Sequence, residues 1–361
     1  MKSKIKYFLF GPKTSVSMFS YEPYLAFLEK HFERTFNQKK ADIVIVSFIN
    51  DIFENLKDFL GILKSLNVKI FLLSEEPLWD ALSKEYISNP KSNKVEINFT
   101  GLNFKLNSIN YMNSNVFDFN EIPYFITTNR KYIFNYWDSL KPLRQMNDNQ
   151  IFSAWSQKKY NFCAIGRNLS SDPRFEFCEN DEIPILSKKR SILSEEIGEV
   201  LGDSFIFGEG WEYINKSRRK IHAKDLDSSI YASKESCLWH HQKLIFAKKH
   251  SKFLMSAENT ICKNYVTEKF FDGPTSFSIP IFFSNKNEKA YNRIRGVNLS
   301  GFNRANCTIE DYILESVDCK DTLLHNLNYA KKVFSENIFE KVNREINSRC
   351  KNLTNSIIKK I

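Results

Sequence analysis

Residues 253–259 read FLMSAEN, residues 265–269 read YVTEK and residues 279–283 read IPIFF, and this stretch decides the fold. The first segment is an apolar run that predicts a buried strand ending in an acid and an amide. The second places Thr-Glu-Lys at a predicted helix start, and the third predicts the next strand. A strand, a polar loop, a helix and a strand in this order gather hydrogen-bonding groups, a cation and backbone N–H groups at one point, which suits a phosphorylated ligand.

Strands and helices alternate on the N-terminal side of this stretch as well. Apolar runs predict strands at Ile5–Phe10, Ala41–Ile49 and Val68–Leu73, and helical spacing predicts helices at Tyr21–Phe32 and Ile52–Leu66. This alternation is typical of a parallel sheet covered by helices.

A second alternating series contains the stretch quoted first. Its predicted strands are Asn161–Ile165, Ser204–Phe207, Lys252–Met255 and Ile279–Phe283, and its predicted helices are Lys188–Leu201, Cys237–Lys249 and a start at Val266–Asp272. Polar segments at 82–120 and 209–234 are expected to be loops, the first with short strands. Gly273-Pro274 should end or kink the helix that begins before it.

The composition favours a folded protein. The chain has 361 residues, of which 42% are hydrophobic and 14% aromatic, enough for one large domain or two of ordinary size. No apolar run approaches the roughly 20 residues of a membrane-spanning helix, and the N-terminus predicts a first strand rather than a signal peptide. Seven scattered cysteines without a C-x-x-C pair indicate reduced thiols and a cytoplasmic protein.

The charge of the chain leaves two interpretations open. A net charge of +10 fits a phosphate-rich partner, such as a nucleotide, an anionic glycolipid or a membrane surface, and equally a merely basic soluble protein. The last part of the chain is basic and amphipathic, so it either touches an anionic membrane or packs on the body, and packing is favoured. No nucleic-acid partner is expected.

The stretch at 253–283 resembles the donor-binding signature of the α-1,3-fucosyltransferases, glycosyltransferase family 10. That signature contains Glu-Asn after an apolar run, then a short gap, Tyr-(Val/Ile)-Thr-Glu-Lys and a strand with (Ile/Val)-Pro-(Ile/Val). The matching residues here are Glu258, Asn259, Tyr265, Val266, Thr267, Glu268, Lys269, Ile279, Pro280 and Ile281. The resemblance is firm over about residues 250–285 and weaker over 160–210 and 65–125.

The resemblance implies an α/β fold of the GT-B type, in which two Rossmann-like domains face each other across a cleft and C-terminal helices follow. Combined with the two alternating series, it predicts an N-terminal acceptor domain at 1–150, a nucleotide-sugar donor domain at 151–330 and a basic helical tail at 331–361.

Residues of the signature are candidates for binding the donor. Thr267 is expected to cap the helix, which puts Glu268 and Lys269 in its first turn, where backbone N–H groups and the Lys269 ammonium can meet a pyrophosphate. By resemblance, Glu268 binds the ribose and Lys269 faces the phosphates or the sugar. The full set of expected donor contacts from the signature is Glu258, Asn259, Tyr265, Thr267, Glu268 and Lys269.

A departing diphosphate needs a second cation. The resemblance implies an upstream arginine near the start of the helix that follows a strand. Arg190, in the segment SKKR, is the candidate, and Arg174, in the segment DPRF, is the alternative. The chain departs from the family here, because Gly-Arg-Asn at 166–168 stands where the family has Ser-Asn.

An inverting transfer also needs a base that takes the proton of the acceptor hydroxyl. Glu75 follows the strand Val68–Leu73 in the segment SEEP and is the candidate, with Glu76 as the alternative. Family members carry a glutamate in a similar place. Two adjacent carboxylates raise one another's pKa, which suits a base.

No metal site is predicted. The segment Asp225-Leu226-Asp227 matches the D-x-D pattern of metal-dependent transferases but lacks a preceding apolar strand, so it is interpreted as a solvated loop. His240 and His241 point in different directions on a helix and have no partner at ligand spacing, so they are interpreted as structural or surface residues.

Together these features predict a metal-independent, inverting glycosyltransferase without a cofactor. The expected donor is GDP-fucose, and the expected acceptor is a glycan or glycolipid of a bacterial surface, such as lipopolysaccharide or capsule. Two alternatives stay open: a transferase of the same fold that uses another GDP-sugar or a CMP-linked acid, and a non-catalytic glycan- or nucleotide-binding protein. The expected location is the cytoplasm, with or without peripheral contact at the inner face of the membrane.

Overall fold

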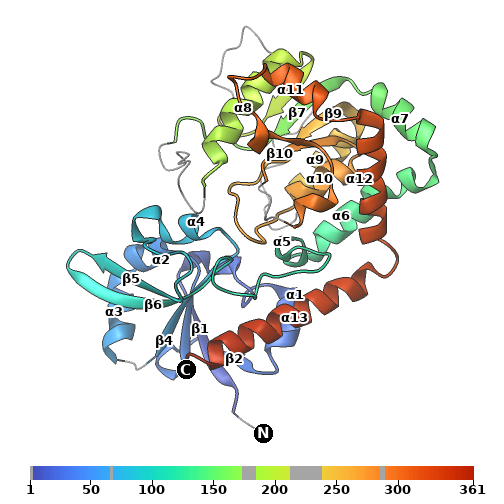
Figure 1. Cartoon of the computed structure of the whole chain (residues 1–361). Coiled ribbons are helices and arrows are strands. Elements are labelled where there is room, and N and C mark those ends of the chain that lie inside the picture. The colour runs from blue at the N-terminus through green and yellow to red at the C-terminus, as the bar shows by residue number, and fades with distance from the viewer. Residues whose placement is uncertain (1–2, 66–67, 173–183, 212–237, 285–288) are drawn as a thin grey trace. The chain divides into compact units, whose positions relative to one another are not determined.

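The structure is a computed structural model that describes residues 3–65, 68–172, 184–211, 238–284 and 289–361 (Figure 1). The chain divides into two compact units. Unit 1 consists of Met1–Asn129, Cys262–Tyr265 and Phe339–Ile361, and unit 2 consists of Arg130–Ile261 and Val266–Ile338. The division therefore falls near residue 130 rather than 150, and most of the segment 331–361 belongs to unit 1.

Unit 1 is built on a twisted sheet with helices around it. In its described part, six strands lie in the order β2-β1-β3-β4-β6-β5, all in parallel pairs except β5 and β6. The strands are β1 Ile5–Phe10, β2 Phe32–Arg34, β3 Ile43–Val46, β4 Lys69–Leu73, β5 Lys94–Phe99 and β6 Leu102–Ile109. Every residue of β3 (IVIV) is buried, as expected of a central parallel strand that is covered on both faces.

The helices of unit 1 are short except for the last one. They are α1 Glu22–Leu28, α2 Ile49–Glu54, α3 Leu56–Ser65, α4 Leu78–Leu82, α5 Tyr124–Thr127 and α13 Ile338–Ile358, with 3-10 turns at Pro12–Val16, Gln38–Lys40 and Lys84–Tyr86.

The polar segment 82–120, expected to be mostly loops, contains a regular hairpin. Strands β5 and β6 are joined by Thr100 and Gly101, whose φ angles are 46° and 80°. Two positive φ angles in a two-residue loop match the twist of antiparallel strands, and glycine adopts such an angle without strain.

Helix α13 packs into unit 1 through both apolar and polar side chains. Val342, Ile346 and Leu353 are buried, and so is Arg349, which is 0% exposed and donates to Thr127 Oγ1 at 3.0 Å and to the Ile122 carbonyl. These apolar residues of the basic segment are therefore engaged inside the protein, and the membrane contact considered for this segment has no support from them.

Unit 2 contains the second parallel sheet. Its five described strands lie in the order β11-β10-β9-β7-β8, and every pair is parallel. The strands are β7 Tyr160–Ile165, β8 Ser204–Phe207, β9 Ser251–Met255, β10 Ile279–Phe282 and β11 Val297–Asn298. The predicted α/β fold with two Rossmann-like sheets and C-terminal helices is confirmed.

The helices of unit 2 cover both faces of this sheet (Figure 1). They are α6 Arg130–Leu140, α7 Asp148–Ser156, α8 Ser187–Val200, α9 Leu238–His250, α10 Lys269–Thr275, α11 Ile309–Glu315 and α12 Cys319–Val333, with 3-10 turns at Pro142–Gln145, Tyr291–Arg293 and Leu299–Gly301. Helix α10 ends one residue after Pro274, as predicted. A Cβ at Gly273 would lie 3.0 Å from the Pro280 side chain, so the glycine allows α10 to pack closely on β10.

A buried lysine joins several elements of unit 2. Lys158, before β7, is 5% exposed, and its ammonium lies within 3.3 Å of five oxygens: the carbonyls of Ala247, Ser251, Ser276 and Phe277 and the hydroxyl of Ser278. Burial lowers the pKa of Lys158 well below its usual value. The lysine ties the end of α9 to the start of β9 and to the turn before β10.

The change Lys158→Met should lower the free energy of unfolding by about 3 kcal/mol, because it leaves several buried acceptors without a donor. Urea unfolding at neutral pH measures this loss. Lys159→Met removes the same charge from an exposed neighbour and should change stability by less than about 0.5 kcal/mol. Equal effects of the two changes would contradict a structural role for the oxygen cage.

Candidate functional site

A small cavity lies at the carboxyl ends of two neighbouring strands of unit 2. Residues 164–166 at the end of β7 and Met255 and Ala257 at the end of β9 form part of its wall. Its volume is about 50 Å³, which is room for roughly three to five water molecules or a group of similar size such as a phosphate, since one water needs roughly 10–15 Å³. Ligands of open parallel sheets bind at this end of the strands.

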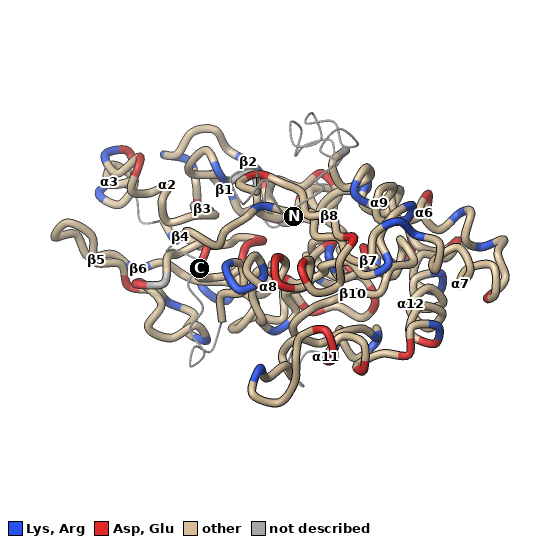
Figure 2. The backbone as a smooth tube through the Cα atoms, turned by 90° about the horizontal axis from the view of Figure 1, so that it is seen from above, with Lys and Arg blue, Asp and Glu red and all other residues tan. Residues whose placement is uncertain are grey.

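The charged side chains that line the cavity are all cations in the described part of the chain. They are Arg167 after β7, Arg190 from α8, Lys243 from α9 and Lys269 from α10. Elsewhere in both units, the described basic residues are interspersed with acidic ones along the chain (Figure 2). Three of these four cations also pair with a carboxylate: Lys269 with Glu268, Lys243 with Asp272 and Arg167 with Glu209. The cavity wall therefore offers charged hydrogen-bond donors, which suit a small anion.

Two of the predicted donor residues meet at this cavity. The Arg190 guanidinium Nη1 donates to Asn259 Oδ1 at 2.9 Å and to the Ala257 carbonyl at 3.1 Å. The backbone supports this contact, because the Leu186 amide donates to the Asn259 carbonyl at 2.8 Å just before α8. Arg174, the alternative to Arg190, lies outside the described residues, as does the segment 225–227.

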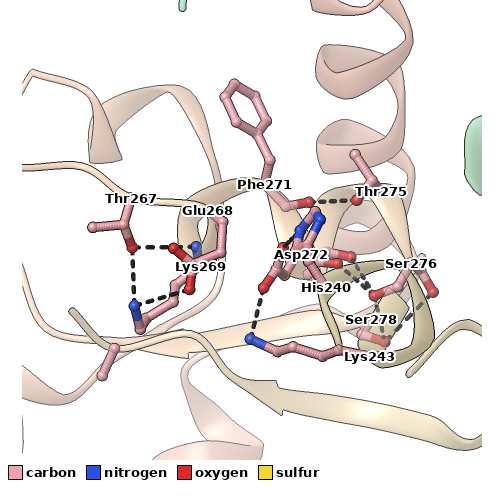
Figure 3. A network of polar contacts seen from close by, with 12 residues as sticks. His240, Lys243, Thr267, Glu268, Lys269, Phe271, Asp272, Thr275, Ser276 and Ser278 are labelled. Atoms are coloured by element: carbon pink, nitrogen blue, oxygen red, sulfur yellow. Dashed lines mark hydrogen bonds and ion pairs between the residues drawn. The ribbon is translucent and has the colours of Figure 1, made fainter. Parts of the chain in front are cut away.

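Lys269 lines the same cavity and is held by three neighbours. Its ammonium lies 3.0 Å from Glu268 Oε1, 3.0 Å from Thr267 Oγ1 and 3.8 Å from Glu258 Oε2 (Figure 3). Burial acts to lower the pKa of Lys269, but the two carboxylates raise it above its usual value, so the side chain stays charged. The predicted pair of cations, Arg190 and Lys269, is thus brought to one place.

Glu258 and Thr267, both expected to contact the donor, are bonded to each other. Glu258 is 1% exposed, and its two oxygens accept from the Thr267 amide and hydroxyl, each at 2.6 Å. Burial raises the pKa of Glu258, although the Lys269 ammonium opposes this. In this arrangement Glu258 fixes the segment that precedes α10 and does not line the cavity.

The expected helix cap needs correction. Helix α10 begins at Lys269, with Glu268 rather than Thr267 in the N-cap position and no side-chain cap bond there. The amides of Phe270 and Phe271 already donate to the carbonyls of Thr267 and Glu268. The Thr267 hydroxyl donates to Glu258, and its oxygen accepts a long, 3.5 Å bond from the Lys269 amide. The first amides of α10 thus have partners within the chain.

Glu268 is buried beside the cavity and does not line it. Its side chain is 5% exposed and accepts from Lys269, while Oε2 has no hydrogen-bond partner among the described residues. Burial acts to raise the pKa of Glu268, and the Lys269 and Lys243 ammonium groups lower it to below its usual value. Glu268 is therefore an ionised carboxylate within the charged network.

The centre of this network, Asp272, is a residue that sequence reasoning missed. Its carboxylate is 0% exposed, with Oδ1 2.9 Å from His240 Nε2 and Oδ2 2.7 Å from Lys243 Nζ (Figure 3). The Tyr136 hydroxyl from α6 lies 3.1 Å from Oδ1 and 2.8 Å from the Glu268 carbonyl. The spacing His-x-x-Lys, which puts both side chains on one face of α9, is the sequence signal that could have revealed it.

The candidate base and Tyr265 lie together in unit 1. The Tyr111 hydroxyl donates to the Glu75 carbonyl at 2.9 Å, and the rings of Tyr111 and Tyr265 contact edge to face at 5.3 Å. Glu75 and Glu76 follow β4 and are half-buried. The pKa of Tyr21 is raised well above its usual value, mainly because the side chain is buried and also because the Glu75 carboxylate lies near it. Tyr111 and Tyr265 are both buried, so these contacts fix the backbone at Glu75 next to the buried Tyr265 ring.

Among the described residues, no group of three or more His, Cys, Asp or Glu side chains is arranged to hold a metal ion. Within the same residues, no helix is both long and apolar enough to cross a membrane.

The fold and the cavity define a class of protein, an α/β protein with a cation-lined cavity at the carboxyl ends of parallel strands. The model of glycosyltransferase family 10 (fucosyltransferase), C-terminal part, matches residues 212–318. The resemblance predicted from the signature is confirmed over this region, which contains Glu258, Lys269 and Asp272 but not Arg190.

Comparison with whole proteins gives weaker similarity. No curated protein matches the chain. A crystal structure of an alpha1,3-fucosyltransferase has 13% sequence identity to this chain and a TM-score of 0.44. The alignment spans 97% of this chain and 92% of the chain in that structure. A structure of an alpha1,3-fucosyltransferase with GDP-fucose has 12% identity and a TM-score of 0.40, and the alignment spans 95% of this chain and 81% of that one. A structure with GDP has 14% identity and a TM-score of 0.41, and the alignment spans 97% and 92% of the two chains. At these values they carry no argument about function.

The buried Asp272 carboxylate should make the free energy of unfolding depend on pH in the acidic range. Although burial opposes ionisation, Lys243 and His240 hold the pKa of Asp272 well below its usual 3.8. The resulting stability is present above about pH 4 and is lost as the pH falls towards the native pKa. Asp272→Asn should therefore cost about 3 kcal/mol at pH 7 and progressively less below pH 4, as measured by urea unfolding at several pH values.

The exposed change Asp203→Asn is the control for this measurement, because residue 203 has a φ of 29° that asparagine tolerates. Its stability should follow that of the unchanged protein at each pH. A difference between Asp272→Asn and the unchanged protein that stays constant from pH 7 to pH 3 would show that Asp272 is not an ionised partner of Lys243.

Proposed function

We propose that this chain is an inverting, metal-independent glycosyltransferase that moves fucose from GDP-fucose to a hydroxyl of a bacterial surface glycan, such as lipopolysaccharide or capsule. The observation that carries the proposal is the position of Arg190 and Lys269 at one small cavity, at the carboxyl ends of β7 and β9. The match of residues 212–318 to the C-terminal part of a fucosyltransferase family supports the same conclusion.

The proposed chemistry is a single displacement. The acceptor hydroxyl attacks the anomeric carbon of the donor sugar, the bond from that carbon to the phosphate oxygen breaks, and the nucleoside diphosphate leaves. Glu75 takes the proton of the attacking hydroxyl, with Glu76 as the alternative base. Inversion follows because attack and departure occur on opposite faces of one carbon.

The negative charge that develops on the leaving diphosphate requires stabilisation. Arg190 and Lys269 supply it, in the place that a divalent metal takes in other transferases. Both side chains are held before any ligand binds, Arg190 by Asn259 and Lys269 by Glu268 and Thr267, so little reorganisation is needed when the donor arrives. Glu268 for the ribose, and Asn259 and Tyr265 for the phosphates or sugar, complete the proposed donor site.

Thermal unfolding with a panel of ligands tests the donor. GDP and GDP-fucose at about 100 times their dissociation constant should stabilise the protein by roughly 2.7 kcal/mol, and the shift should survive EDTA. GDP-mannose, UDP-sugars and CMP-sugars serve as competitors. A shift with CMP or UDP instead would keep a transferase but exclude fucose, whereas loss of the GDP shift in EDTA would exclude metal independence.

Two variants test the residue roles. Glu75→Gln should keep GDP-fucose affinity within a few-fold and lower kcat by about 10²–10⁴-fold, because it removes the base alone. Lys269→Met should weaken GDP binding at least tenfold, as measured by calorimetry on protein shown to be folded by circular dichroism. Turnover retained in Glu75→Gln would transfer the role to Glu76, and donor binding without turnover in the unchanged protein would favour a non-catalytic binding protein.

A further inference from the structure

Two lysines of unit 2 are buried to a similar degree but have different surroundings. Lys158 is 5% exposed and has five oxygen partners, which more than satisfy its three N–H groups. Lys243 is 3% exposed, and among the described residues its ammonium has one partner, Asp272 Oδ2 at 2.7 Å. Buried donors are normally satisfied, so Lys243 has hydrogen-bonding capacity that the described protein groups do not use.

The Lys243 side chain belongs to the wall of the cavity. Lys243 is one of its lining residues, together with Arg190 and Lys269, and these cations come from three different helices. Asp272 holds the ammonium in place, because its other oxygen is fixed by His240 at 2.9 Å (Figure 3). The Tyr136 hydroxyl lies 3.1 Å from the same oxygen. The lysine therefore cannot leave the cavity wall without breaking a buried ion pair.

The chemistry of the cavity indicates what would satisfy this lysine. The space suits one phosphate group, its charged lining is cationic, and phosphate oxygens accept several hydrogen bonds at once. The three oxygens of a phosphate group can accept from several of these donors together, whereas a single sugar hydroxyl offers only two lone pairs.

We propose that Lys243 is a third phosphate-binding cation of this cavity, and that it donates its remaining hydrogen bonds to a phosphate group of the ligand while Asp272 keeps it in position. The inference rests on the proposed function and deepens it, since it assigns to the donor site a residue outside the signature. It also makes the Asp272 network part of ligand binding and not of stability alone.

Calorimetric titration with inorganic pyrophosphate and with GDP tests the proposal. Lys243→Met, which keeps the length of the apolar stem, should weaken the binding of both ligands by about 10- to 100-fold. Lys249→Met removes the same charge from an exposed position of the same helix and should leave both affinities within about twofold. Affinities in Lys243→Met equal to those of the unchanged protein would overturn the inference.

Variants of Asp272 separate ligand binding from a purely structural role. If Lys243 binds phosphate, Asp272→Asn should be less stable and should weaken pyrophosphate binding by a smaller factor than Lys243→Met, because the ammonium remains but is no longer held at the cavity wall. The double change Lys243→Met with Asp272→Asn should regain stability relative to Lys243→Met and still bind weakly. Recovery of full affinity in the double variant would show that Lys243 is merely the counter-ion of Asp272, and would overturn the inference.

The two probes also separate this inference from the proposed function. Binding of pyrophosphate but not GDP to the unchanged protein, lost in Lys243→Met, would support the phosphate site and overturn the nucleotide-sugar donor. Binding of GDP that is insensitive to Lys243→Met would do the reverse. No binding of either probe would overturn both.

Discussion

The buried carboxylate of Asp272 is the interaction on which the arrangement of unit 2 depends. It accepts from His240 and pairs with Lys243 on α9, it lies beside Tyr136 on α6, and it is itself part of α10. A carboxylate without water is stable only when its charge and lone pairs are compensated, so these three helices are held in one relative position. That position places Lys269 and Lys243 at the wall of one cavity.

A second buried carboxylate acts over a shorter distance. Glu258 ends the β9 segment and binds the amide and hydroxyl of Thr267, which fixes the path of the chain into α10. In the sequence, Glu258 and Thr267 belong to the same signature as Lys269, but in the structure they position Lys269 and do not line the cavity. One sequence signature can thus contain both a residue that lines the cavity and the residues that hold it in place.

The local pattern of apolar residues predicted many of the strands and helices. The features that it did not predict depend on contacts between residues far apart in the sequence. Strand β1 was predicted at its observed bounds, and α8, β9 and β10 within a residue, because their apolar periodicity is strong. The hairpin β5–β6 was predicted only as short strands, since its Thr-Gly turn is not the usual Asn-Gly signal. At the site, the proximity of Arg190 and Lys269 was predicted, whereas the pairing of Lys243 with Asp272 depends on which faces of α9 and α10 meet, and periodicity does not specify this.

The position of helix α13 affects the order in which the two units can fold during synthesis on the ribosome. Unit 1 begins with the first strand of the chain but includes Phe339–Ile361, whose Arg349 fills its interior and binds Thr127. Domains usually fold in the order of their synthesis. Here unit 1 cannot complete its core until residues 339–361 have been made, whereas unit 2 is complete at Ile338. The unit whose synthesis starts first is therefore completed after the other.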